Sequence, residues 1–98
     1  MKHPIHYVTR VLVVAPYTLC VEFEDATTQT INFEPVLRGE LYGPLRGLEL
    51  FKQVRIDPEV RTLVWPNGAD FDPATLHDWP VFSAALIAQA RSWDLVSD

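Results

Sequence analysis

The carboxylates of Asp70 and Asp72 are the side chains of this chain best placed to do chemistry together. If the segment around them is extended, both carboxylates lie on one face, because alternate residues of an extended chain share a face. Two neighbouring carboxylates can act as an acid–base pair, since the like charges raise the pKa of one of them. The competing role is structural: Asp72 caps a helix that begins at Pro73, and Asp70 folds back onto the turn at 67–68. We favour the structural role for the pair and keep Asp70 as a candidate for binding.

A histidine just downstream of this segment adds a potential metal ligand. His77 lies beside Asp78, and together with Asp70 and Asp72 it could supply nitrogen and oxygen ligands. The sequence has no His-x-x-x-His or Cys-x-x-Cys pattern, and Cys20 is its only cysteine, which excludes an intrachain disulfide and a multi-cysteine zinc site. We therefore predict no metal site and no cofactor. The candidate interaction or ligand residues are Trp65, Asn67, Asp70 and His77.

The sequence contains no motif for a nucleophilic serine and none for binding a phosphate. There is no Gly-x-Ser-x-Gly, and Ser83, Ser92 and Ser97 have no adjacent histidine. The four glycines are isolated, so no glycine-rich loop can cradle a phosphate. We name no catalytic residue and favour a protein that is not an enzyme.

The composition predicts one folded domain, residues 1–98, with an acidic surface. The chain has 98 residues, 48% of them hydrophobic, and a net charge of −5. Its eight cations are scattered, which argues against direct binding of nucleic acid, because that needs a basic face. The apolar run at 11–15 is far shorter than the roughly 20 residues that span a bilayer. We predict a cytoplasmic protein without a membrane segment.

Patterns of apolar residues predict the elements that must position these side chains. Strand formers and alternation predict five short strands, at 5–16, 19–23, 29–33, 54–57 and 62–65. The first three form an antiparallel meander and the last two a hairpin. Helical turns are expected at 35–39 and 48–51, with a loop at 41–45, a helix at 73–77 and a longer helix at 78–93. Phe82, Leu86 and Ala90 form a stripe that can dock on the sheet. The order of elements predicts an α+β fold with a mostly antiparallel sheet, short helices and a C-terminal helix.

A specific pattern runs through the last strand and the turn after it. Residues 62–73 read Thr-Leu-Val-Trp-Pro-Asn-Gly-Ala-Asp-Phe-Asp-Pro, and Pro44-Leu45 and Phe51 precede the strand at 54–57. With these features the chain resembles domain-of-unknown-function family 2442 (DUF2442), a family of small bacterial proteins, over about residues 5–77. It departs from the family pattern at Ala26, where the family usually turns with glycine, and in a helical extension at about 79–98.

The resemblance implies a curled antiparallel sheet with short helices, and it brings no established activity or catalytic residues. Some members of the family look like one half of toxin–antitoxin-type gene pairs, beside a small protein of domain-of-unknown-function family 4160 (DUF4160). Others are fused to a helix-turn-helix domain. We therefore expect a protein-interaction or regulatory module, such as the antitoxin-like half of a two-gene pair. Its partner is expected to be a small, basic DUF4160-like protein or, in a homo-dimer, a second copy. The alternative is a small-ligand or metal-binding domain that uses the loop at 67–72 with His77.

Overall fold

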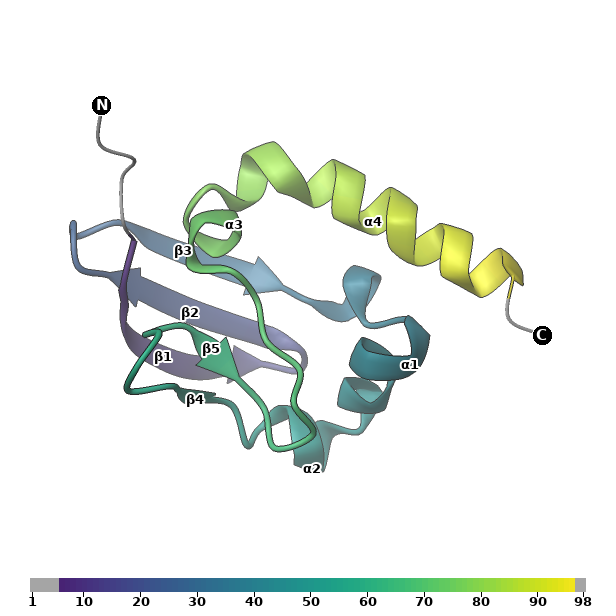
Figure 1. The fold of residues 1–98 in the computed structure, drawn as a ribbon, viewed down its shortest axis with the longest axis horizontal. Coiled ribbons are helices and arrows are strands. Elements are labelled where there is room, and N and C mark those ends of the chain that lie inside the picture. The colour runs from purple at the N-terminus through teal and green to yellow at the C-terminus, as the bar shows by residue number, and fades with distance from the viewer. Residues whose placement is uncertain (1–5, 97–98) are drawn as a thin grey trace.

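Five strands form two antiparallel sheets in the computed structural model, which describes residues 6–96 and their side chains as far as residue 92. The larger sheet has the order β1-β2-β3, with β1 at Val8–Ala15, β2 at Thr18–Phe23 and β3 at Thr28–Asn32. The smaller sheet pairs β4 (Arg55–Ile56) with β5 (Leu63–Val64). The predicted α+β fold with about five strands is confirmed, as a meander and a hairpin that form separate sheets (Figure 1).

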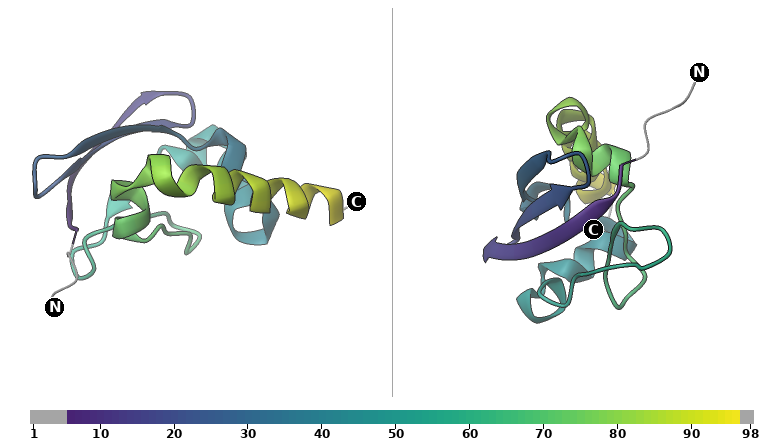
Figure 2. Two further views of the ribbon diagram at one scale, coloured as in Figure 1. Left: turned by 90° about the horizontal axis from the view of Figure 1, so that it is seen from above. Right: turned by 90° about the vertical axis from the view of Figure 1, so that its left-hand side faces the viewer.

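The larger sheet follows the alternation of its sequence and is curled. Leu19, Val21 and Phe23 are buried on one face of β2, while Cys20 between them is only partly buried. The pairing of β1 with β2 shifts register twice, between Val8 and Arg10 and between Val13 and Ala15. Such irregularities bend a strand and increase its twist, and the sheet is visibly curved in Figure 2.

In the described part of the chain, six helices follow the meander, and all but the last are short. They are η1 (Glu34–Val36), α1 (Gly39–Tyr42), η2 (Gly43–Arg46), α2 (Leu48–Phe51), α3 (Pro73–His77) and α4 (Trp79–Val96). The prediction of a loop at 41–45 is wrong, because the chain there forms the end of α1 and most of η2. Pro44 lies in the first turn of η2, where its missing N–H is not needed, so Gly43-Pro44 starts a new helical turn.

One hydrophobic core joins the elements. Its largest fully buried side chains come from the sheet, the short helices and β5, among them Leu19, Phe33, Phe51 and Leu63. The long helix α4 packs on η1, α1 and α3 and extends past α1 (Figure 1). The stripe predicted to dock on the sheet therefore serves a helical contact instead: Ala90 is buried, and Phe82 at its start stays exposed. Among the described residues, no helix has the length and apolar character to cross a membrane.

Candidate functional site

A tight turn shapes the loop between β5 and α3. The Gly68 N–H donates to the Trp65 carbonyl at 3.0 Å, and the Trp65 N–H donates to the Ala69 carbonyl at 2.9 Å. Gly68 has a φ of 90°, a conformation that residues with a side chain rarely adopt. The side chain of Asn67 accepts the Ala69 N–H at 3.2 Å. The Asn-Gly turn predicted from the sequence is confirmed.

The first residue of this loop, Trp65, belongs to the core. Its side chain is 3% exposed, and its Nε1–H donates to the carbonyl of Phe51 at 2.9 Å. Its ring also contacts the rings of Phe33, Phe51 and Phe71. The structure therefore places this candidate interaction residue where it stabilises the fold and does not face solvent.

Two long-range hydrogen bonds hold the loop against α1. The Asn67 Nδ2 donates to the carbonyl of Leu41 at 3.0 Å, and the Tyr42 hydroxyl donates to the carbonyl of Asp70 at 2.8 Å. The Tyr42 ring also stacks on Phe71, with the ring centroids 4.9 Å apart. Asn67 thus serves the loop itself, and Tyr42 is brought beside Asp70.

A cleft of about 340 Å³ opens between this loop, α1, α3 and α4. Its polar side is made by residues from four segments: Tyr42, Asp70, Asp72, Thr75 and Gln89. Its apolar side is made by Val36, Phe71 and Leu86. We call this feature the acidic cleft, because the charged residues that line it are Asp70 and Asp72.

The two carboxylates of the acidic cleft differ in their bonding. One oxygen of Asp72 accepts the Thr75 N–H at 3.3 Å, so Asp72 caps α3 as predicted, with Pro73 in the first turn. The Asp70 carboxylate is exposed and bonds to no side chain or N–H of the described residues. Burial raises the pKa of the Tyr42 hydroxyl, and the negative charge of Asp70 raises it further, so this hydroxyl stays a hydrogen-bond donor. The acidic cleft therefore offers an unpaired negative charge beside an aromatic ring.

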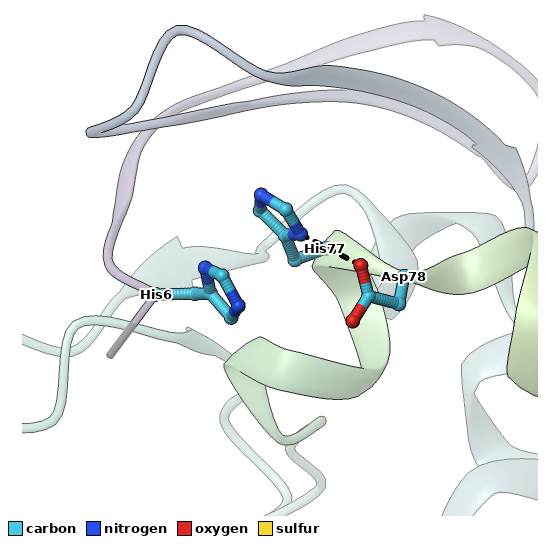
Figure 3. A group of neighbouring side chains, drawn as sticks. All are labelled: His6, His77 and Asp78. Carbon is cyan, nitrogen blue, oxygen red and sulfur yellow. Dashed lines mark hydrogen bonds and ion pairs between the residues drawn. The ribbon is translucent and has the colours of Figure 1, made fainter. Parts of the chain in front are cut away.

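His77 lies in a different environment, among residues that do not line the acidic cleft. Its Nε2 is 2.7 Å from Oδ2 of Asp25, and its Nδ1 is 2.9 Å from Oδ1 of Asp78. Its ring stacks on His6 with the centroids 3.7 Å apart (Figure 3). The ring of Phe23 also meets it edge-on. The side chain is only 14% exposed.

The two carboxylates favour the protonated form of His77, which can donate from both ring nitrogens. The hydrogen bond to Asp78, and after it the bond to Asp25, raise the pKa of the imidazole against the opposing effect of burial. The pKa of Asp25 falls to about 2, mainly because the Thr27 N–H donates to its carboxylate and next because His77 does. The cluster ties the turn between β2 and β3 to the junction of α3 and α4.

The structure thus divides the predicted site residues. Asp70 lies in the acidic cleft, Asn67 supports the loop beside it, Trp65 lies in the core, and His77 faces Asp25 and His6. Sequence reasoning missed Tyr42 and Gln89 in the cleft, and the contacts of His77 with His6 and Asp25. All of these are far from their partners in the sequence, and no local pattern marks them.

Comparison with known proteins gives one match. A family model described as "Protein of unknown function (DUF2442)" matches residues 8–80, which include the strands, the loop and α3. No curated protein and no solved structure matches the chain.

Proposed function

This chain belongs to the DUF2442 family of proteins of unknown function, and we propose that it is a protein-interaction module whose acidic cleft binds a basic side chain of a small partner protein. The exposed carboxylate of Asp70 carries this proposal. It has no side-chain or N–H partner among the described residues, and it lies beside Tyr42, whose one hydroxyl proton is already donated to the Asp70 carbonyl. A charge held in such a place is available for a ligand of opposite charge.

The shape of the acidic cleft suits an arginine or a lysine. A guanidinium group can donate two hydrogen bonds to the two oxygens of one carboxylate and stack on an aromatic face, here that of Tyr42. The methylene stem of the same side chain can lie along Phe71 and Leu86, which line the cleft. The carbonyl oxygen of Gln89 can accept a further hydrogen bond from the guanidinium.

The charge of the whole chain supports a basic partner. A net charge of −5 attracts a cationic protein and accelerates the encounter, an effect that added salt weakens. The resemblance to members paired with a DUF4160-like protein supports a small basic protein encoded beside this one, in an antitoxin-like or regulatory pair.

The test is co-purification with the product of the neighbouring gene, followed by calorimetric titration. Asp70→Asn keeps the shape of the side chain and removes its charge, and Glu59→Gln makes the same charge change at an exposed residue outside the cleft. We expect Asp70→Asn to weaken binding at least roughly tenfold, the scale of a lost charged hydrogen bond, and Glu59→Gln to leave it nearly unchanged. A chain that binds no neighbour, or equal losses in both variants, would contradict the proposal.

A small-ligand role is the alternative, and the same cleft can test it. Free arginine amide and small diamines carry the chemistry of the basic side chain without the partner protein. A rise in melting temperature with these compounds, lost in Asp70→Asn and seen without any protein partner, would favour the small-ligand alternative.

A homo-dimer is the other predicted arrangement, and the edge of β1 supports it. β1 is an outer strand, and Leu12, Val13 and Val14 at its end are between 44% and 53% exposed. Unpaired apolar strand edges readily pair with another strand. Arg10 is the only charged residue of β1, so two copies can pair their apolar ends without opposing like charges. We therefore propose a second copy as the partner of this edge.

A further inference from the structure

Three potential metal ligands meet where the start of the chain passes the junction of α3 and α4. His6, His77 and Asp78 each offer one ligand atom, and these atoms lie within 4.8 Å of one another. Figure 3 shows the ring of His6 beside that of His77, one nitrogen of which is bonded to the carboxylate of Asp78. The three side chains come from two parts of the chain that are far apart in the sequence.

A fourth residue orients the central histidine. Asp25 accepts the hydrogen bond of the His77 Nε2 at 2.7 Å, and its other oxygen accepts the Thr27 N–H at 3.0 Å. A metal ion would replace the proton that Nδ1 of His77 shares with Asp78, 2.9 Å away, while Nε2 keeps the proton that it donates to Asp25. In metal sites, a ligand histidine usually donates its other ring N–H to a carboxylate, and this hydrogen bond fixes the tautomer and the orientation of the ring.

The backbone and ring of His77 are also held in place. Gln29 donates from Nε2 to the His77 carbonyl at 2.7 Å, and Phe23 packs its edge against the ring at 5.0 Å. The position is therefore rigid before any ion arrives, which reduces the entropy lost on binding.

We propose that this cluster binds a divalent transition-metal ion of the zinc type through Nδ1 of His77, the carboxylate of Asp78 and a ring nitrogen of His6. Two imidazoles and one carboxylate are a ligand set that suits Zn²⁺, Co²⁺ or Ni²⁺ and not Mg²⁺ or Ca²⁺, which prefer oxygen ligands. Asp25 is a positioning residue. The site shares no residue with the acidic cleft, so it stands or fails independently of the proposed function.

Binding requires a movement of His6. Its ring is stacked on that of His77 at 3.7 Å with only 13° between the planes, so one ion cannot lie in the planes of both rings. His6 is half-buried and lies two residues before β1, so the proposal requires a rotation of its side chain and not a movement of the sheet. The stack of the two rings is therefore the metal-free arrangement.

The experiment titrates the full chain, freed of metal by a chelator, with Zn²⁺ and separately with Co²⁺. We expect one ion per chain by calorimetry, and a visible Co²⁺ absorption spectrum showing nitrogen and oxygen ligands. His6→Ala and Asp78→Asn should each weaken Zn²⁺ binding at least tenfold. Asp25→Asn should weaken it roughly 10- to 100-fold, the usual loss for an orienting carboxylate, while the Co²⁺ spectrum keeps its form.

Three controls distinguish this site from nonspecific binding. Glu49→Gln removes an exposed carboxylate elsewhere and should change nothing, and Mg²⁺ should produce no binding. His3, which lies outside the described residues, provides the matched histidine control. Absence of saturable Zn²⁺ binding would overturn the proposal, as would binding that is lost in His3→Ala and kept in His6→Ala.

Discussion

Replacing Ala26 by glycine should stabilise the protein. Ala26 closes the turn between β2 and β3 with a φ of 72°, in the left-handed region. Its N–H donates to the Phe23 carbonyl at 3.0 Å, while the Phe23 N–H donates to the Thr27 carbonyl at 2.9 Å. This is a three-residue hairpin loop whose last residue takes the left-handed conformation that glycine adopts without strain.

The size of the effect follows from two opposing terms. The left-handed conformation costs a residue with a side chain roughly 1–2 kcal/mol. Glycine adds backbone freedom to the unfolded chain, which lowers stability by about 0.4–1 kcal/mol. We expect Ala26→Gly to raise the free energy of unfolding by about 0.5–1 kcal/mol. For a domain of this size, that is an increase in melting temperature of roughly 2–8 °C.

Thermal and urea unfolding followed by circular dichroism measure this change. The matched control is Ala84→Gly, the same substitution at an exposed residue inside α4. There glycine relieves no strain and should lower stability by roughly 0.5–1 kcal/mol. The two variants therefore predict opposite signs. If Ala26→Gly lowers stability as much as the control does, the assignment of strain to Ala26 is wrong.

Three further outcomes are expected. Trp65→Phe removes the indole N–H from the carbonyl of Phe51, which keeps only the longer bond from the Val54 N–H at 3.3 Å, and should cost about 0.5–1.5 kcal/mol in urea unfolding; no change in stability would contradict a contribution from the indole bond. Backbone N–H groups of Val60 and Glu59 lower the pKa of Asp57 below its ordinary 3.8. Its contribution to stability is therefore complete above about pH 4 and disappears as the pH falls through the lowered pKa. The stability difference between the wild-type protein and Asp57→Ala should narrow in acid, and a difference independent of pH would refute this. For the homo-dimer, light scattering should show Val14→Lys as a monomer under conditions where the wild-type chain is dimeric, and a monomeric wild-type chain at high concentration would contradict the dimer.

The sequence was most informative where structure is decided by neighbouring residues. Asp72 caps α3 because its side chain reaches an N–H three residues later, and Gly68 turns the chain because it lacks a side chain. The strands could be predicted from the alternation of apolar residues, and in β2 every second residue is indeed buried. The prediction of a loop at 41–45 was wrong because a Gly-Pro pair can either break a helix or begin one. The sequence alone does not distinguish these two roles, and here Pro44 lies in the first turn of η2.

The candidate site was predicted only in part because its residues meet through the fold. Asp70 could be named from the loop, but Tyr42, which bonds to its carbonyl, is 28 residues away. Trp65 could not be placed, because a tryptophan suits both a core and an interface, and its hydrogen-bond partner is a backbone carbonyl 14 residues earlier. His77 could be named as a candidate binding residue, but His6 and Asp25, which contact it, come from the beginning of the chain and from the turn after β2.

The position of α4 has a consequence for the acidic cleft. The family match ends at residue 80, whereas Leu86 and Gln89, which close one side of the cleft, lie beyond it. The part of the chain that the family model matches therefore carries the carboxylates, and α4 decides how enclosed they are. A chain that stopped after α3 would present the same charges on an open surface. Substitutions at Leu86 or Gln89 would therefore change the enclosure of the carboxylates and leave the matched region itself unaltered.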